Sequence, residues 1–130
     1  VVIPIHPRTR KKLQELNFDF KQTRLQLVDP VGYLEMVHLL KHCSLVATDS
    51  GGLQKEAYFF KKYCITLRTE TEWVELVEQG ANIITGWKYE DILNSYKQLK
   101  HTTKDVFSSP LYGAGQAGHI IIRELQRIDS

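Results

Sequence analysis

Residues Val46 to Ala57, VATDSGGLQKEA, combine residue types that could hold an anion where a strand becomes a helix. Gly51 and Gly52 allow the backbone to approach a ligand closely, and the hydroxyl of Ser50 is a further donor. The first turn of a helix offers unpaired N–H groups at its positive end, so a diphosphate is the guest that this turn favours. Glu56 follows about one turn later, where a carboxylate would repel phosphate. We therefore expect Glu56 to face hydrogen-bond donors such as ribose hydroxyls.

The same turn also has a purely structural interpretation. Asp49 or Ser50 would cap the helix, and the two glycines would ease a tight turn. The spacing matches neither GxGxxG nor a Walker loop, so both interpretations stay open on spacing alone.

His6 and Arg68 also follow apolar runs, at positions where the carboxyl ends of strands would place them beside a ligand. Each has a structural alternative. His6 would be a structural histidine, and the segment after Arg68 would be a capping loop with Thr71 as the N-cap and Glu72 in the first helical turn. Trp73 is expected to pack in the core rather than in a site.

His38 and His42 are spaced i, i+4 on one expected helix, as in a metal-binding pair. No carboxylate or further histidine completes a ligand set nearby, so no metal site is predicted. No Ser/His/Asp constellation and no pair of acid/base carboxylates stands out, so no catalytic residue is assigned in this chain.

Apolar runs alternate with segments of helical period along the chain. Strands are expected over residues 1–5, 24–28, 45–48, 63–67 and 81–85, and helices over residues 9–16, 33–43, 53–60, 72–79, 89–100 and 117–128. The last helix is expected to turn Ile121, Ile122, Leu125 and Ile128 inward. Because the strands are apolar throughout, they predict an α/β, Rossmann-like fold: one domain, with a parallel sheet of about five strands and helices on both faces.

The composition is that of an ordinary globular protein, with 42% hydrophobic and 25% charged residues. A formal net charge of +2 is too small to favour nucleic acid or a membrane surface as a partner. No apolar run approaches the ~20 residues of a membrane span.

Cys43 and Cys64 lie in apolar surroundings without a CxxC motif, which favours reduced thiols in a cytoplasmic protein. The chain opens directly in an apolar strand, VVIPIHP, so we expect a piece of a larger protein.

Four stretches, in this order, carry a resemblance that covers nearly the whole chain. They are HPRT (residues 6–9), TDSGGLQKEA (48–57), LRTETEWVELVEQGAN (67–82) and YGAGQAGHII (112–121). Together they resemble the non-hydrolysing UDP-N-acetylglucosamine 2-epimerase family, and they look like the C-terminal half of that two-domain enzyme. The resemblance implies the GT-B architecture, in which this chain would be the half that binds the nucleotide sugar.

The resemblance also implies roles for residues at matching positions. These are Ser50, Gly51 and Gly52 for the diphosphate, Glu56 for the ribose, and Tyr33 and Met36 for the helix that lines the uracil pocket. It supports His6 as a site residue, and Arg68 keeps a cation near the ligand.

Two departures from the family pattern bear on ligand contacts, the first on uracil stacking and the second on an arginine that contacts the ligand in other members. Many members carry an aromatic residue where this chain has Met36, and better-known members have Thr-Glu-Arg-Pro-Glu where this chain has Thr-Glu-Trp-Val-Glu at residues 71–75. The stretch PVGYLEM, Lys55 and the TEW triplet are similar to a branch that includes epimerases of UDP-2,3-diacetamido uronic acids. Both sugars therefore stay open.

In the family, C2 is inverted by removal of its proton and elimination of UDP, which re-adds to the resulting 2-acetamidoglucal. The acid/base carboxylates belong to the N-terminal domain, so the resemblance implies that this chain alone is inactive and holds the leaving group. It implies neither a nicotinamide cofactor nor a metal.

The implied partners are a UDP-sugar, the N-terminal domain and, for the full-length enzyme, a second copy, with polysaccharide biosynthesis as the setting. The nucleotide half of a GT-B glycosyltransferase and a non-catalytic UDP-sugar-binding module remain as alternatives.

The resemblance raises a question about the sheet. The family's domain begins with one more strand, which lies in the middle of the sheet between the strands expected here at residues 1–5 and 45–48. Because buried backbone groups without partners are costly, we expect these two strands to pair directly, in the sheet order second, first, third, fourth, fifth. A segment from a second copy is the alternative that would fill the gap.

Overall fold

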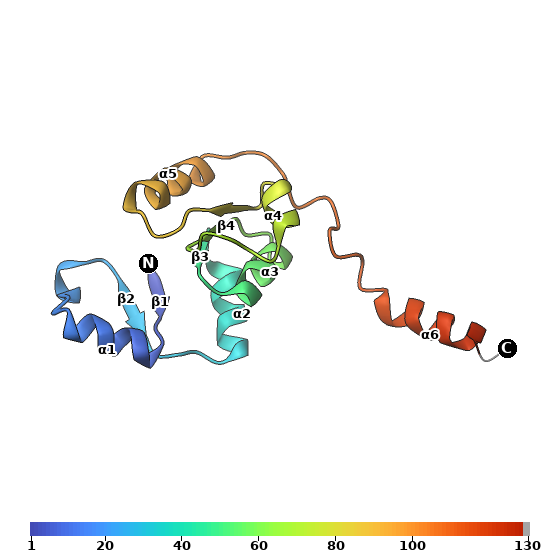
Figure 1. Cartoon of the computed structure of the whole chain (residues 1–130), viewed down its shortest axis with the longest axis horizontal. Coiled ribbons are helices and arrows are strands. Elements are labelled where there is room, and N and C mark those ends of the chain that lie inside the picture. The colour runs from blue at the N-terminus through green and yellow to red at the C-terminus, as the bar shows by residue number, and fades with distance from the viewer. Residues whose placement is uncertain (129–130) are drawn as a thin grey trace. The chain divides into compact units, whose positions relative to one another are not determined.

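Short parallel strands form two separate ladders in the computed structural model, which describes residues 1–128 (Figure 1). The first ladder belongs to a compact unit, Val1–His42, and the second to a unit that begins at Cys43. The α/β class and the parallel strand direction predicted from the sequence are confirmed.

The first unit alternates strands and helices. Its elements are β1 (Val2–Pro4), α1 (Pro7–Glu15), the 3₁₀ helix η1 (Phe20–Gln22), β2 (Gln26–Val28) and α2 (Tyr33–His42). β1 pairs with β2 in parallel, with Val2 opposite Gln26. Pro7 occupies the first helical position of α1, where its missing N–H has no intrahelical partner to lose.

The second unit contains a three-stranded ladder in the order β3-β4-β5. Its elements are β3 (Val46–Thr48), α3 (Gly51–Phe59), β4 (Cys64–Thr66), α4 (Val74–Glu78), β5 (Asn82–Ile84), α5 (Tyr89–Lys100) and α6 (Ala117–Ile128). α3 contacts β3 and β4, and α5 contacts β4. The two helices lie on opposite faces of this ladder (Figure 1). Because β3 and β4 pair in parallel, their carboxyl ends lie at the same edge of the ladder, next to the start of α3.

The middle strand β4 is buried along its whole length, from Cys64 to Thr66. Burial raises the pKa of the Cys64 thiol to about 12, and a hydrogen bond with Thr66 offsets part of that rise. A hydrophobic cluster adjoins the strand, made of Tyr58, Leu76, Ala81 and Val106 with Trp73, Tyr112 and other aromatic residues packed against it. Tyr58 of α3 and Leu76 of α4 belong to this cluster, so both helices pack on the same core.

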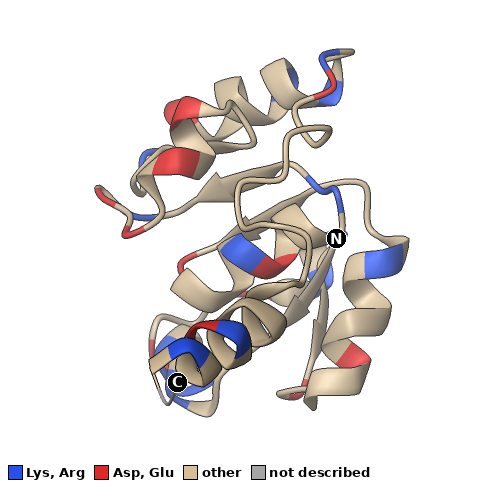
Figure 2. Ribbon diagram, turned by 90° about the vertical axis from the view of Figure 1, so that its right-hand side faces the viewer, with Lys and Arg blue, Asp and Glu red and all other residues tan. Residues whose placement is uncertain are grey.

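Charges on α5 follow the helix dipole. Glu90 and Asp91 lie in its first turn, and Lys97 and Lys100 lie in its last turn (Figure 2). Acidic groups near a helix N-terminus and basic groups near its C-terminus each stabilise the helix by about 0.3–1 kcal/mol. The absence of a side-chain cap at Lys88 is offset in this way.

The predicted pairing of the first and third strands is wrong. β1 pairs with β2 and β3 pairs with β4, and in residues 1–128 the two ladders share no hydrogen-bonded strand pair. The sheet order second, first, third, fourth, fifth is therefore not formed. Apolar composition indicates that a strand is buried, but its neighbour is decided by the crossover connection that carries the chain from one strand to the next.

Most predicted elements are present with shifted ends. α1 begins at Pro7 rather than at residue 9, α3 begins at Gly51 rather than at 53, and α4 begins at Val74 rather than at 72. Two of these shifts have the same cause, because a proline or a glycine occupies the first helical turn and hides its start from a periodicity argument.

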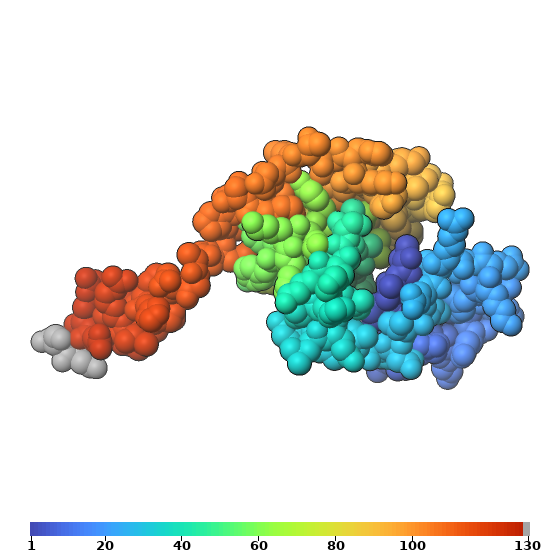
Figure 3. All heavy atoms as spheres, turned by 180° about the vertical axis from the view of Figure 1, so that it is seen from behind, coloured from blue at the N-terminus to red at the C-terminus, as the bar shows by residue number. Residues whose placement is uncertain are grey.

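The final helix α6 spans Ala117–Ile128 as predicted, but its apolar residues do not face inward. Ile121, Ile122, Leu125 and Ile128 are all exposed, from 56% to 79% (Figure 3, red). Helical spacing shows which residues share a face and leaves open what covers that face. No helix within residues 1–128 is long and apolar enough to cross a membrane.

Leu76 gives a direct test of this core, because its side chain is 1% exposed while Val74 on the same helix is 58% exposed. Leu76→Ala is expected to lower the free energy of unfolding by about 2–5 kcal/mol, since it removes buried methyl groups and leaves a cavity. Val74→Ala, the matched control, is expected to change it by less than about 0.5 kcal/mol. Urea unfolding followed by circular dichroism measures both, and equal effects would contradict the assigned burial.

Candidate functional site

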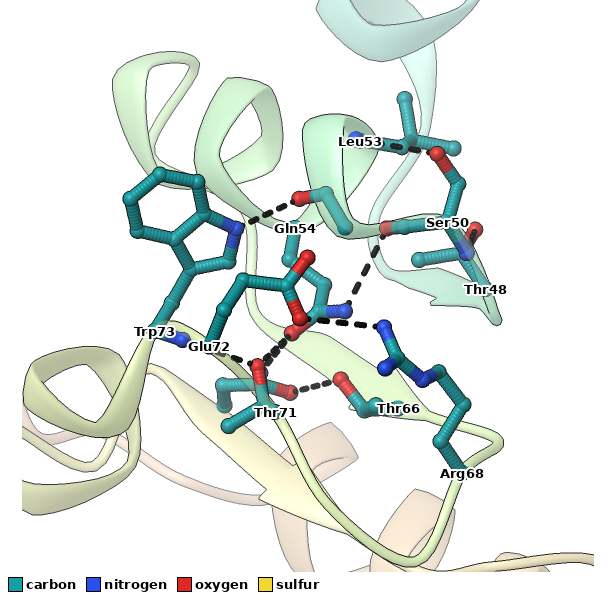
Figure 4. Close-up of polar contacts among 11 residues, drawn as sticks. Thr48, Ser50, Leu53, Gln54, Thr66, Arg68, Thr71, Glu72 and Trp73 are labelled. Atoms are coloured by element: carbon teal, nitrogen blue, oxygen red, sulfur yellow. Dashed lines mark hydrogen bonds and ion pairs between the residues drawn. The ribbon is translucent and has the colours of Figure 1, made fainter.

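Side-chain hydrogen bonds stabilise both ends of the turn between β3 and α3. Ser50 is the N-cap of α3, and its Oγ accepts from the Leu53 N–H at 3.4 Å (Figure 4). The Ser50 N–H donates to Thr48 Oγ1 at 3.0 Å. The structural interpretation of this turn is therefore confirmed for Ser50 rather than for Asp49. Among the described residues, no group accepts a hydrogen bond from the N–H of Gly51 or Gly52, which leaves both amides available.

The side chain of Glu72 lies directly against Gly51. A Cβ built on Gly51 would lie 1.7 Å from Oε1 of Glu72, far inside any van der Waals contact. A Cβ on Gly52 would meet nothing within 4 Å. With Glu72 in this position a side chain at residue 51 would clash with its carboxylate, whereas the space beside Gly52 is open.

Arg68 follows the carboxyl end of β4, as predicted, and lies near the same turn. Its Nη1 forms an ion pair with Oε2 of Glu72 at 3.0 Å, and the two side chains are 35% and 47% exposed. The Arg68 carbonyl also accepts from the Gly86 N–H, which ties this loop to the end of β5. The structure therefore brings Ser50, Gly51 and Arg68 to one edge of the ladder.

A buried polar network beneath this edge was not predicted. Gln54 is 0% exposed, and its Nε2 donates to the Ser50 carbonyl at 3.3 Å. Its Oε1 accepts from the Thr71 hydroxyl at 2.6 Å and from Asn82 Nδ2 at 3.0 Å. Asn82 Oδ1 in turn accepts from Thr66 Oγ1 at 2.8 Å. A signal was present in the sequence, since Gln54 occupies the same face of α3 as Ala57 and Tyr58 at i, i+3 and i+4.

Trp73 packs against the core cluster, as predicted, and also supports the turn. Its indole Nε1 donates to the Gly51 carbonyl at 2.8 Å (Figure 4). The Lys55 ammonium lies 4.4 Å from the centroid of the Trp73 ring and 4.2 Å from that of Tyr112. The cation lies over both rings, which meet each other edge to face.

The capping loop expected after Arg68 has a different geometry. α4 begins at Val74 and its N-cap is Trp73, so Thr71 is not the N-cap and Glu72 precedes the helix. The Thr71 hydroxyl instead accepts from the Trp73 N–H at 3.1 Å while donating to Gln54. The buried amide of Gln54 competes successfully for this hydroxyl, which spacing alone does not reveal.

Two titratable groups lie beside this loop. Burial raises the pKa of the Tyr112 hydroxyl, and the nearby Glu75 carboxylate raises it further. Within the described residues, no partner meets hydrogen-bond geometry at the Tyr112 hydroxyl. The pKa of Glu75 is lowered, chiefly because its carboxylate accepts a hydrogen bond from its own backbone N–H. The Tyr112 hydroxyl lowers it further. Neither group belongs to the predicted site.

Glu56 is half-buried on α3, and in residues 1–128 its carboxylate forms no hydrogen bond or ion pair. Its side chain is therefore available to a ligand with hydroxyl donors. A pocket of the second unit lies elsewhere, beside β5, and is lined by residues such as Tyr63, Ile83 and Leu99. No predicted site residue lines it.

The remaining predicted residues lie in the unit Val1–His42. His6 is the N-cap of α1, and its Nδ1 accepts from the Arg8 N–H at 3.2 Å, which supports its structural alternative and leaves Nε2 to carry the proton of the neutral ring. Tyr33 opens α2 and is 67% exposed, and Met36 on the same helix is half-buried.

The histidine pair on α2 is close but forms no ligand set. The rings of His38 and His42 lie 4.3 Å apart, and His42 Nδ1 is 2.8 Å from the His38 carbonyl. No group of three or more His, Cys, Asp or Glu side chains with metal-binding geometry gathers among residues 1–128.

Comparison with known proteins agrees with this arrangement of elements. Residues 1–126 match the family model described as UDP-N-acetylglucosamine 2-epimerase. The chain belongs to this epimerase family.

Relatives in the UDP-N-acetylglucosamine 2-epimerase family match over almost the whole chain. The UDP-2,3-diacetamido-2,3-dideoxy-D-glucuronate 2-epimerase of Pseudomonas aeruginosa is 47% identical over 98% of this chain. The structure of the UDP-GlcNAc 2-epimerase from Methanocaldococcus jannaschii superposes with a TM-score of 0.82 at 39% identity over 97% of the chain. The same enzyme in complex with UDP-GlcNAc and UDP gives a TM-score of 0.78. The chain spans 35% of the length of each of these proteins.

The buried network gives a second prediction. Gln54→Leu keeps the side-chain volume but removes the partners of Ser50, Thr71 and Asn82, so the free energy of unfolding is expected to fall by about 2–4 kcal/mol. Gln98→Leu on the exposed face of α5 is the matched control and is expected to be nearly neutral. Thermal and urea unfolding compare the two variants. A Gln54→Leu protein as stable as the control would refute the role assigned to the amide.

Proposed function

We propose that this chain supplies the UDP-binding part of a UDP-sugar 2-epimerase. The observation that carries the proposal is the pair of available amides at Gly51 and Gly52, on a turn that Ser50 caps and that has Arg68 nearby. Backbone amides at a helix N-terminus together with a guanidinium suit a diphosphate. The UDP complex of a relative with 39% sequence identity supports the choice of nucleotide.

Each predicted residue takes one role in this proposal. Ser50, Gly51 and Gly52 bind the diphosphate, and Arg68 balances its charge. Glu56 accepts hydrogen bonds from the ribose hydroxyls, which agrees with a carboxylate that has no protein partner. The uracil is assigned to Tyr33 and Met36 on α2, and His6 is assigned to the site through the family resemblance.

The proposed reaction inverts C2 of the sugar. A base removes the C2 proton while the C1–O bond breaks, so UDP leaves with the bonding electrons and a 2-acetamidoglucal forms; UDP then re-adds as a proton returns to C2 from the other face. The residues of this chain would stabilise the negative charge that develops on the departing diphosphate. The acid/base carboxylates are assigned to the domain that precedes this chain.

Two sugars fit the proposal. UDP-N-acetylglucosamine is favoured by the family description and by the Methanocaldococcus relatives. A UDP-2,3-diacetamido uronic acid is the second candidate, because the Pseudomonas enzyme of that specificity is 47% identical to this chain. Purified full-length protein incubated with each sugar, followed by ¹H NMR of the product, distinguishes the two.

The setting of the whole protein belongs to the same proposal. We assign it an N-terminal domain that closes over the UDP-sugar, a homodimeric assembly, and a place in polysaccharide biosynthesis. The cytoplasm suits Cys43 and Cys64, which are both thiols rather than a disulfide.

Variants of Ser50 and Glu56 test this site when the binding of two ligands, UDP and uridine, is compared. Ser50→Ala is expected to weaken UDP more than uridine, because only UDP carries phosphate, and Glu56→Ala is expected to weaken both. Titration of the ¹⁵N-labelled chain should give dissociation constants nearer millimolar than micromolar, about 4 kcal/mol weaker than a micromolar site, since half of the contacts are assigned to another domain. Shifted amides should cluster at residues 50–56 and near Tyr33. Clustering at the amino ends of the strands would refute this site.

The isolated chain is expected not to epimerise UDP-N-acetylglucosamine, because its acid/base carboxylates are assigned elsewhere. ¹H NMR over a day at high protein concentration measures the manno epimer, and turnover near the ~10 s⁻¹ of typical enzymes would contradict the assignment. With the full-length protein, an epimer supports the proposal. A glycoside would favour a glycosyltransferase, and binding without any product would favour a UDP-sugar-binding module.

A further inference from the structure

The carboxylate of Glu72 lies against the first residue of α3. Its Oε1 would be 1.7 Å, and its Cδ 2.9 Å, from a Cβ on Gly51, so the group is in direct contact with the glycine backbone. This places a negative charge beside the positive end of a nine-residue helix. Helix N-termini favour anions there by about 0.3–1 kcal/mol.

The second oxygen of the same carboxylate pairs with Arg68. Nη1 of Arg68 and Oε2 of Glu72 are 3.0 Å apart, and both side chains remain partly exposed. The two positive features proposed to receive the diphosphate, the start of α3 and the Arg68 guanidinium, are thus both already in contact with one protein carboxylate.

The residues on either side of Glu72 are fixed by hydrogen bonds. The Thr71 hydroxyl donates to the buried Gln54, and the Trp73 indole donates to the Gly51 carbonyl. The loop is therefore held in place on both sides, while the Glu72 side chain is 47% exposed and hydrogen-bonds to Arg68. Removal of the carboxylate from Gly51 requires a rotation of this side chain and no movement of the loop.

We propose that Glu72 is an internal competitor for the diphosphate: it occupies the anion position in the free protein and must rotate away when UDP binds. The proposal rests on the diphosphate site of the proposed function. A diphosphate placed on Gly51 and Arg68 would meet a like charge in contact with both, so binding exchanges one anion for another. Glu72 therefore lowers the affinity for UDP and leaves that for uridine, which has no phosphate, unchanged.

The test compares UDP and uridine binding by the wild-type chain, Glu72→Gln and Glu70→Gln. Glu70 is an exposed carboxylate of the same loop, and among the described residues no hydrogen bond or ion pair joins its side chain to Gly51 or Arg68, so its variant controls for the change in net charge. Dissociation constants come from ¹⁵N chemical-shift titrations. Glu72→Gln is expected to bind UDP roughly threefold to fivefold more tightly than wild type, the value of one partly exposed charge interaction. Uridine binding, and UDP binding by Glu70→Gln, should change by less than about 1.5-fold.

The outcomes separate this inference from the function on which it rests. Unchanged UDP affinity in Glu72→Gln would overturn the competitor role, and weaker binding would show instead that the carboxylate positions Arg68 for the ligand. An equal gain in UDP affinity in Glu70→Gln would show that the effect comes from net charge alone, and this result would also overturn the competitor role. The indole N–H resonance of Trp73, unshifted by the substitution, reports that the loop is intact. If the wild-type chain shows no UDP-dependent shifts at residues 50–56, the proposed function itself fails.

Discussion

The side-chain amide of Gln54 joins the turn at the start of α3 to the loop after β4 and to the strand β5. Its nitrogen donates to the Ser50 carbonyl, and its oxygen accepts from Thr71 and from Asn82. The side chain is completely buried, and so is Asn82, so without Gln54 the Asn82 amide would lose a partner that water does not replace. This cost makes the positions of the cap, of β5 and of the loop after β4 depend on one another.

Because Thr71 is held by Gln54, the residues that follow it have little freedom. Glu72 is directed at Gly51, and Trp73 reaches the Gly51 carbonyl with its indole N–H. Trp73 is therefore part of the support of the turn. Its ring also packs on the core cluster and receives the Lys55 ammonium on its face.

The electrostatics of the turn follow from the same geometry. A helix of nine residues begins with two available amides, a cation follows the next strand, and one carboxylate contacts both. In the free protein the local charges of Arg68 and Glu72 therefore balance.

The sequence by itself determined the α/β class, the order of strands and helices, and the turn that carries the candidate site. These features depend on local information: apolar runs, helical spacing, and the Ser-Gly-Gly sequence after a strand. It also supplied the family, through motifs spread over nearly the whole chain. The serine cap and the position of Arg68 after β4 agree with the structure for the same reason, since both depend on neighbours close in sequence.

Only the tertiary structure decided which strands pair, what faces inward, and what the polar residues contact. β1 pairs with β2 and not with β3, and the apolar side chains of α6 are exposed, although their composition and spacing are those of buried elements. The contacts of Gln54 with Asn82, and of Glu72 with Gly51, join residues that lie more than twenty positions apart. Periodicity describes one element at a time, whereas such contacts depend on how the elements pack together, which the local pattern does not contain.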